Sequence, residues 1–381
     1  MRTGGGRILT THVGSLPRPD ALAALLLAKE HGEDYDEDAL DRLTEAAVRD
    51  AVADQRAVGI DIVNDGEVGR TGYATYIQDR LSGFSGESPS LRFDDLSDFP
   101  EYRRRMGQAA GTRRLHRPRC TGPVALRDSA PLAREIERLT AALDAAGAAE
   151  GFMNAASPGV IAVFQANDFY SDMDAYLGAL ARAMKPEYEA IAAAGLVLQI
   201  DCPDLAMGRH VIYGEEDDAL FLRRAAMQVE VLNAALENVP ADRARLHVCW
   251  GNYEGPHHRD IPLEAIADVL LSAKPQGLLF EAANPRHAHE WTVFRDRSGW
   301  DDKILIPGVI DSTTNYVEHP ELVAERVGRF VDIAGCDRVI AGTDCGFATF
   351  AGIGKVDPAI ARLKLAALVE GAQIASRRLG G

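Results

Sequence analysis

Arg245-Leu-His-Val-Cys-Trp250 is a short apolar run that places a histidine and a cysteine two residues apart near its end. Two further runs have the same form: Gly277-Leu-Leu-Phe-Glu281 ends in a carboxylate, and Arg338-Val-Ile-Ala-Gly-Thr-Asp-Cys345 ends in a thiol. Short apolar runs bounded by polar residues are typical of buried strands. If these strands are neighbours in one parallel sheet, their ends converge, and the three runs predict a single site.

The rest of the chain alternates short apolar runs with longer amphipathic segments. Apolar residues at three- and four-residue spacing predict helices at Asp36–Val58, Ala175–Ala194, Ala219–Leu236, Leu263–Ala273, Glu321–Ala334 and Pro358–Arg378. Strands are expected at Ile8–Val13, Ile60–Asp65, Gly159–Phe164, Leu196–Asp201, Leu246–Trp250, Leu278–Glu281, Ile304–Ile310 and Val339–Thr343. Eight strands joined by helical connections predict an α/β fold, a (β/α)8 TIM barrel, with an open doubly wound sheet as the alternative.

The stretch from Thr71 to Gly151 does not fit a single strand–helix unit. It contains the breaker-rich run Ser82-Gly-Phe-Ser-Gly-Glu-Ser-Pro-Ser90. We therefore expect an insertion at about 71–151, between the second and third barrel strands, where long insertions often cover the mouth of an active site. Because no repeat or low-complexity linker divides the chain, residues 1–381 are expected to form one domain.

The charge balance disfavours several classes of partner. The 381 residues include 57 acidic and 41 basic ones, a net charge of −16, whereas nucleic acid and anionic membranes reward a basic surface. No apolar stretch approaches the ~20 residues that span a bilayer, and the N-terminus lacks the apolar core of a signal peptide. A cytoplasmic location is the expectation, and the sequence leaves open whether the chain forms a homo-oligomer.

Four potential metal ligands stand at the ends of the three quoted runs: His247, Cys249, Glu281 and Cys345. Residues i and i+2 of a strand point to the same side, so the histidine and the first cysteine can share one ion. Two thiolates, one imidazole and one carboxylate suit Zn²⁺, a borderline-soft, four-coordinate ion. The chain has five cysteines at irregular spacing, an odd count that argues against a disulfide framework and favours metal or catalytic use.

Acidic residues also collect at the ends of the predicted strands, namely Glu67, Asp201, Glu281, Asp311 and Asp344. Any one of them alone could cap the helix that follows it. Five on one rim indicate a functional site, because catalytic groups of an α/β barrel gather at the C-terminal ends of its strands.

These motifs together resemble the C-terminal catalytic barrel of the cobalamin-independent methionine synthase family. The resemblance runs along nearly the whole chain and rests on Thr11-His-Val-Gly-Ser-Leu-Pro-Arg-Pro19, Asp65-Gly-Glu67, Gln199-Ile-Asp201, His247-Val-Cys249, Phe280-Glu-Ala282, Pro307-Gly-Val309 and Asp344-Cys-Gly346. It implies a single-barrel relative, because the family's N-terminal barrel is missing. It also implies that His247, Cys249, Glu281 and Cys345 bind zinc.

The chemistry that this resemblance implies is transfer of a methyl or other alkyl group to the thiol of homocysteine or a similar amino thiol. Val13, Gly14 and Ser15 would hold the carboxylate of the acceptor, and Glu67 and Asp201 would bind its ammonium group. Zinc coordination would keep the acceptor sulfur as a thiolate near neutral pH. The expected partners are therefore an amino thiol and an alkyl donor.

Three positions depart from the family pattern on the donor side. Thr313 stands where the family has a catalytic histidine, Gln165 stands near its folate-stacking tryptophan, and Met207 stands at the acid that anchors the pterin ring. These changes lead us to expect a methyl donor other than the standard folate.

The change at Thr313 leaves the role of proton donor unassigned. The candidate catalytic residues are His257 and His289, each in a loop after a metal-ligand run, and the rim acid Asp311. For the two histidines the alternative is ordinary hydrogen bonding within loops.

Two other functions stay open at this point. One is thiol addition to an epoxide, as in the related epoxyalkane:coenzyme M transferases, which the same zinc thiolate would support. A sulfonate thiol would, however, need cationic contacts where Glu67 and Asp201 stand. The other is a zinc- or thiol-binding protein without catalytic activity.

Overall fold

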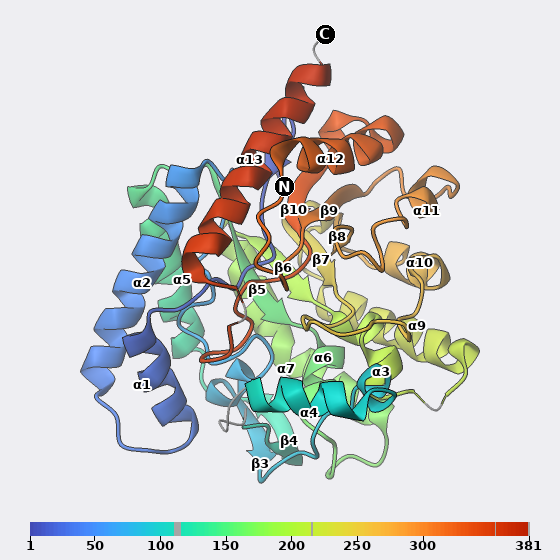
Figure 1. The fold of residues 1–381 in the computed structure, drawn as a ribbon. Coiled ribbons are helices and arrows are strands. Elements are labelled where there is room, and N and C mark those ends of the chain that lie inside the picture. The colour runs from blue at the N-terminus through green and yellow to red at the C-terminus, as the bar shows by residue number, and fades with distance from the viewer. Residues whose placement is uncertain (110–115, 215, 355, 380–381) are drawn as a thin grey trace.

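The centre of the molecule is an eight-stranded parallel sheet in the order β1-β10-β9-β8-β7-β6-β5-β2. The computed structural model describes residues 1–109, 116–214, 216–354 and 356–379. Helices surround the sheet on its outer side (Figure 1). The strands are β1 Leu9–Thr10, β2 Ile62–Val63, β5 Glu150–Ala156, β6 Val197–Asp201, β7 Ala244–Val248, β8 Gly277–Glu281, β9 Ile304–Ile310 and β10 Ile340–Thr343.

Hydrogen bonds between the two edge strands close the sheet into a barrel. The Asp61 amide donates to the Thr10 carbonyl at 3.2 Å, and the Thr11 hydroxyl donates to the Ile62 carbonyl at 3.0 Å. The predicted (β/α)8 barrel is therefore confirmed, and the open doubly wound sheet is not the fold.

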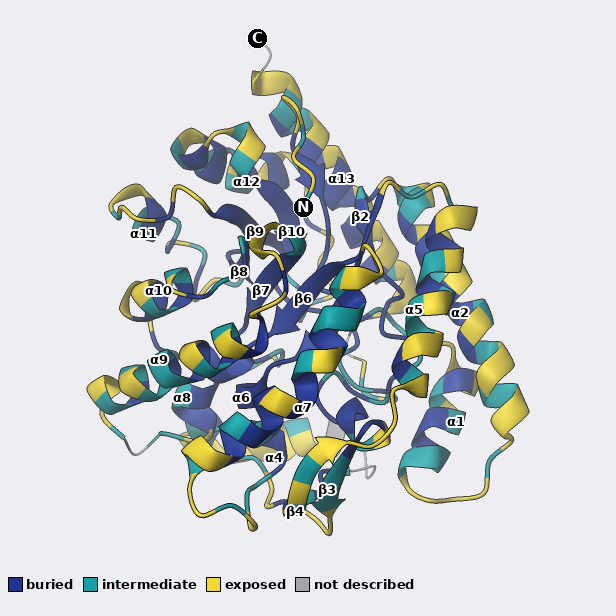
Figure 2. Cartoon of the chain, turned by 180° about the vertical axis from the view of Figure 1, so that it is seen from behind, coloured by how far each residue is buried: buried dark blue, intermediate teal, exposed yellow. Residues whose placement is uncertain are grey.

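The barrel strands are buried on both faces. Every residue of β6, β7 and β8 is buried, and Figure 2 shows the strands in dark blue inside helices with exposed outer faces. Burial on both faces explains why the strands read as continuous apolar runs without alternation. Their C-terminal residues therefore emerge together at one end of the barrel.

The long helices begin and end close to the predicted positions. The Asp36 side chain accepts the amide of Ala39 at the start of α2, and Gly59 ends this helix with a left-handed φ of 103°, a conformation that glycine adopts without steric cost. The barrel helices are α1 Asp20–Glu30, α2 Glu37–Val58, α5 Ala130–Ala145, α6 Pro158–Phe164, α7 Met173–Ala193, α8 Gly208–Val211, α9 Asp218–Ala235, α10 Leu263–Leu271, α11 Thr292–Arg295, α12 Pro320–Ala334 and α13 Pro358–Leu379.

The third barrel strand is not where the apolar pattern placed it. The predicted strand Gly159–Phe164 lies within helix α6, and the strand is β5, just before it. The Ser157 hydroxyl accepts the Val160 amide at 2.9 Å, and Pro158 occupies the first turn, so the segment has both signals of a helix start. Because this short helix is almost wholly buried, its sequence lacks the polar face that would have revealed its period.

The connection from β2 to β5 contains more than one helix. It holds the antiparallel hairpin of β3 Leu81–Ser85 and β4 Arg119–Leu126, the helices α3 Asp94–Ser97 and α4 Pro100–Ala109, and then α5, which packs beside α2. The hairpin and α4 lie at the end of the molecule opposite to both chain termini (Figure 1). Residues 110–115 of the predicted insertion lie outside the described part of the chain.

No helix in the described ranges is both long enough and apolar enough to cross a bilayer.

Candidate metal centre and substrate pocket

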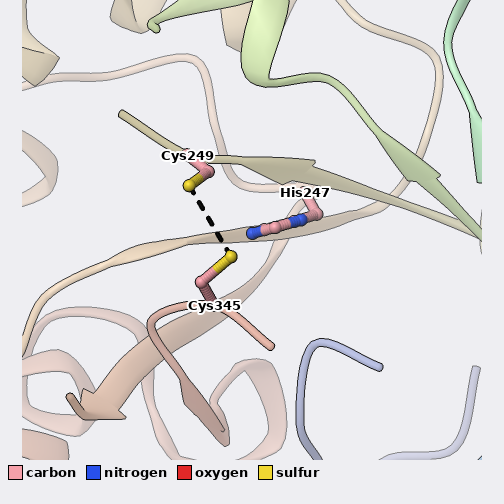
Figure 3. A group of neighbouring side chains, drawn as sticks. All are labelled: His247, Cys249 and Cys345. Carbon is pink, nitrogen blue, oxygen red and sulfur yellow. Dashed lines mark hydrogen bonds between the residues drawn. The ribbon is translucent and has the colours of Figure 1, made fainter. Parts of the chain in front are cut away.

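Three of the four predicted metal ligands meet at the C-terminal end of the barrel. His247 lies on β7, Cys249 follows that strand directly, and Cys345 follows β10. One ligand atom from each lies within 4.8 Å of the other two, and the two sulfur atoms are 3.7 Å apart. All three side chains point toward one another (Figure 3), and all three are buried.

The polarity of this cluster fits a bound metal ion. The Nε2 atom of His247 is buried and has no hydrogen-bond partner among the residues that the structure describes. Its Nδ1 atom is 2.9 Å from Asp201 Oδ1, an arrangement that fixes the ring with Nε2 free to bind a metal. Two thiol sulfurs and one imidazole nitrogen form a donor set for a soft or borderline ion.

Without a metal, the pKa values of the three side chains in the cluster shift in different directions. A hydrogen bond from Cys249, assisted by His247, lowers the pKa of Cys345 to about 6 against the opposing effect of burial. The same hydrogen bond, with burial, raises the pKa of Cys249 well above its usual value. Burial lowers the pKa of His247, but the hydrogen bond with Asp201 and the nearby Cys345 thiol outweigh it and raise the value to about 10. A metal ion that binds here therefore displaces protons.

Glu281, the fourth predicted ligand, stands beside the cluster and is held by hydrogen bonds. It ends β8 and is buried. Its Oε1 atom accepts the Trp250 amide at 2.8 Å, and its Oε2 atom accepts the Asn284 side chain at 3.1 Å. Among the described residues, Glu281 is not part of the group whose ligand atoms all lie within 4.8 Å of one another.

Asp201 connects the metal cluster to the barrel interior. Its Oδ1 atom contacts His247 and accepts Gln199 Nε2 at 2.8 Å, and its Oδ2 atom accepts Asn154 Nδ2 at 3.0 Å. Sequence reasoning missed Asn154, because it lies on β5, the strand that the apolar pattern misplaced. The signal available was its place in a short apolar run immediately before a Ser-Pro helix start.

Replacing Asp201 with asparagine is expected to weaken metal binding about 10- to 100-fold, because carboxylates that orient a ligand histidine have effects of this size. Competition with a chromogenic chelator measures this affinity. Asp204→Asn is the matched control, since Asp204 is equally buried but bonds to Ser157 at 2.7 Å. Equal metal affinity of Asp201→Asn and the wild type would show that this hydrogen bond does not support the ligand.

The cluster opens onto a cavity of about 600 Å³. Val13, Ser15, Glu67 and Asp201, all predicted to bind the acceptor, line this cavity together with the three metal-ligand side chains. Gly14 is not among the described residues that line the cavity, and an added Cβ at this position would lie 2.6 Å from the Asn154 side chain and 2.7 Å from the Glu67 carboxylate. The close approach of these two side chains to the segment after β1 therefore requires a glycine at this position.

Glu67 is a buried acid without a fixed partner. Its Oε2 atom is buried and unpaired within the described residues, and its backbone is left-handed, with a φ of 52°. Burial and the charge of Asp201 raise the pKa of Glu67 to about 8. Backbone strain and an unpaired buried acid are features that cluster at binding sites, and both mark this position.

The two predicted catalytic histidines lie away from this cavity wall. His257 is buried, with Nδ1 at 2.8 Å from Asp260 and Nε2 at 3.0 Å from the Tyr253 carbonyl. His287, two residues before His289 in the same loop, contacts the same Asp260 oxygen at 2.9 Å. His289 is exposed at the surface. The structure thus brings neither His257 nor His289 together with the metal cluster.

Two of the rim acids hold loops. Asp311, the third predicted catalytic residue, accepts the amide and the hydroxyl of Thr313 at 2.6 and 2.8 Å, and both residues line a separate cavity of about 400 Å³. Asp344 accepts the amides of Ala282 and Ala283 at 2.9 Å each, so it fixes the loop after β8.

The other two positions that depart from the family pattern differ in their placement. Gln165 is fully buried and donates to the Ala74 carbonyl at 3.4 Å, whereas the preceding residue, Phe164, lines the cavity. Met207 lines the cavity as well and brings no charge to it. An aromatic ring therefore lies next to the position of the family's folate-stacking tryptophan. No acid stands at the position of the residue that anchors the pterin ring, because Met207 occupies it.

Comparison with known proteins identifies the family. The model of the cobalamin-independent synthase catalytic domain matches residues 142–372. The methionine synthase of Saccharolobus solfataricus is 24% identical over 375 residues, which cover 97% of this chain and 95% of the relative. The methionine synthase of Thermococcus kodakarensis is 26% identical over 371 residues, with 97% and 94% coverage.

Solved structures agree on the fold. A B12-independent methionine synthase from Shewanella sp. W3-18-1, determined in complex with selenomethionine, superposes with a TM-score of 0.75 at 20% identity and covers 98% of this chain and 99% of its own. Since the family model matches more than half of the residues, this chain belongs to the cobalamin-independent methionine synthase family.

Proposed function

We propose that the protein is a zinc-dependent S-methyltransferase whose acceptor is homocysteine or a similar amino thiol. The observation that carries this proposal is that the His247, Cys249 and Cys345 cluster and the two buried acids Glu67 and Asp201 open onto one cavity. A thiol that reaches the metal would then leave its own amino group close to two carboxylates. Membership of a family of methyl-transferring enzymes supports the same reaction.

The spacing of the sulfur atoms supports zinc as the ion. Tetrahedral zinc with Zn–S bonds of ~2.3 Å separates two sulfur ligands by about 3.8 Å, and the two sulfurs here are 3.7 Å apart. Glu281 would complete the set as the exchangeable fourth ligand, because a carboxylate is the hardest donor of the four. Catalytic zinc sites keep such a position for water or substrate, whereas structural sites are closed.

The acceptor would be bound by charge complementarity. Glu67 and Asp201 would hold the ammonium group between them, and Val13, Gly14 and Ser15 would hold the carboxylate. Ionised Glu67 is favoured only when a cation is near, because burial and the charge of Asp201 raise its pKa to about 8. Binding of the ammonium group would therefore remove a proton from this acid.

The residues around the metal have distinct tasks in this reaction. Bound zinc would supply a Lewis acid that keeps the acceptor sulfur ionised near neutral pH. Asp201 holds the imidazole of His247 in place. The Gly251 amide donates to the sulfur of Cys249 at 3.2 Å, which disperses negative charge on that thiolate. Burial of the cluster excludes water and strengthens these electrostatic interactions.

The alternative acceptor is a sulfonate thiol such as coenzyme M. Its sulfonate would lie where Glu67 and Asp201 stand, and like charges in a buried site repel strongly. The amino thiol is therefore the acceptor that this cavity favours.

Homocysteine binding to the zinc-loaded protein is expected to release close to two protons per site near pH 7, one from its thiol and one from Glu67. Methionine, which lacks the thiol, should release only the second. A pH indicator in weak buffer, or calorimetry in buffers of different ionisation enthalpy, measures both values. Proton release by coenzyme M but not by homocysteine would favour the epoxide reaction, and no release by either would contradict an S-methyltransferase.

A further inference from the structure

Five phenylalanine and tyrosine side chains of the described residues line the cavity that holds the metal cluster. Tyr73, Phe164 and Phe350 contact one another, with ring centroids 5.4 to 6.0 Å apart, and Phe93 contacts Tyr253 at 4.8 Å. Four of the five are only partly buried within the protein, and Phe164 is the exception. Their exposed surface therefore belongs in part to the cavity.

A close backbone contact holds the first group of rings, which is Tyr73, Phe164 and Phe350. Gly72 forms an antiparallel bridge with Phe350, and a Cβ at this glycine would lie 2.5 Å from the Phe350 ring. Only glycine permits this approach, which brings Tyr73, in the β2–β5 connection, beside a residue from the loop after β10. Two distant segments of the chain are thus joined to build one aromatic surface.

The ring planes lie at wide angles to one another and do not form a pair of parallel faces. The interplanar angles within the first group are 79°, 48° and 44°, and the Phe93–Tyr253 pair meets at 61°. A flat ring system is bound best between parallel faces, whereas several ring faces at wide angles surround a compact group. Aromatic rings arranged around a compact group are the known way to recognise quaternary ammonium ions, through the negative ring faces.

The cavity wall carries charged groups of both signs, which suits ligands that are zwitterionic. Glu67, Asp201 and Glu87 contribute carboxylates to its wall, and Arg117 is its one guanidinium among the described residues. Arg117 is 8% exposed; its Nη2 atom donates to the Pro89 carbonyl, and its Nη1 atom is buried without a partner in the described ranges. A buried guanidinium with free donors suits a carboxylate on the ligand.

We propose that the alkyl donor is a methylated onium compound, an ammonium or a sulfonium, that carries a carboxylate. The onium group would sit against the rings of Tyr73, Phe164 and Phe350, and the carboxylate would pair with Arg117. This inference rests on the proposed function, because it names the second substrate of the same cavity.

Methyl transfer from such a donor balances without a proton donor. An electron pair on the acceptor sulfur forms the new C–S bond to the methyl carbon. The electron pair of the breaking C–N⁺ or C–S⁺ bond returns to the heteroatom, which leaves as a neutral tertiary amine or thioether. The leaving group therefore needs no acid, in agreement with the positions of His257, His289 and Asp311 outside this cavity.

A charged donor and its neutral isostere separate this proposal from simple apolar binding. The probes are glycine betaine and 3,3-dimethylbutyrate, which differ in the charge of one atom, titrated calorimetrically into the zinc-loaded protein that is saturated with 2-aminobutyrate. The expected result is at least about tenfold tighter binding of glycine betaine. This preference should approach unity in Tyr73→Leu and Phe350→Leu and persist in Phe169→Leu, which changes an exposed ring outside the cavity.

Equal affinity for the two probes in the wild type would overturn the proposal. So would betaine binding that disappears when 2-aminobutyrate is present, because the cation would then occupy the acid pair and not the rings. A variant that lost its fold would bind neither probe. It is therefore distinguished from a variant that binds both probes with equal affinity.

Turnover distinguishes the two onium classes and separates this proposal from the proposed function. Methyl-deuterated glycine betaine and methyl-deuterated dimethylsulfoniopropionate are each incubated with homocysteine, and labelled methionine from either supports the proposal. If homocysteine releases its protons on binding but neither donor yields labelled product, the onium proposal is overturned and the S-methyltransferase stands. If homocysteine releases no protons and no product forms, the proposed function itself fails.

Discussion

Replacing Cys345 with serine is expected to lower zinc affinity by more than about 100-fold and to abolish methyl transfer. Removing a direct ligand should cost more than the 10- to 100-fold of an outer partner, because structural zinc sites gain ~10 kcal/mol or more from their complete ligand set. The hydroxyl of serine does not ionise near neutral pH, whereas the pKa of Cys345 lies at about 6. Metal content after dialysis and chelator competition measure the loss.

Cys202→Ser is the matched control for this substitution. Cys202 is buried, follows the end of β6, and lies outside the group of mutually close ligand atoms in the described residues. Its replacement should leave the zinc affinity unchanged. If Cys345→Ser retained one zinc ion per chain with wild-type affinity, the cluster would not be the metal centre. The metal-free forms of Cys345→Ser and the wild type should melt within a few degrees of each other, which separates loss of zinc from loss of fold.

The barrel could be predicted because its strands are buried on both faces. A strand such as β7 or β8 has no solvent face, so it appears as an unbroken apolar run, and each run ends in a polar residue at the same rim. The same rule failed at α6, because a short buried helix also lacks a polar face. There the decisive signal was local: Ser157 and Pro158 start a helix, and this signal outweighs apolar content.

The site residues on strand ends were easier to predict than those on loops. His247 and Cys345 are positioned by the barrel itself, so their convergence follows from strand order. His257 lies in a loop whose side-chain directions depend on hydrogen bonds with Asp260, a partner that periodicity does not reveal. The aromatic surface was missed for a related reason, since Tyr73 and Phe350 meet only through a loop contact at Gly72.

Replacing Glu67 with glutamine is expected to stabilise the metal-free, ligand-free protein at pH 8 while it weakens acceptor binding. Burial and Asp201 raise the pKa of Glu67 from 4.5 to about 8. Between these values the folded state holds a proton that the unfolded state has released. Stability from this group is therefore complete below about pH 4.5 and is lost as the pH rises through 8. Glutamine does not titrate, so the variant should gain about 3.5 kcal/mol at pH 8 relative to its difference at pH 5.

Acceptor binding should change in the opposite direction. The ammonium group of homocysteine would lose a charged partner, and a hydrogen bond to a charged group contributes ~1.5–3 kcal/mol, or about tenfold or more in affinity. Chemical denaturation at several pH values and titration with methionine measure the two effects. Glu87→Gln is the control, because Glu87 is on the same cavity wall but exposed. If the stability of Glu67→Gln changed with pH in the same way as that of the wild type, Glu67 would not hold the proton. If methionine bound to the variant with unchanged affinity, Glu67 and Asp201 would not be the ammonium site.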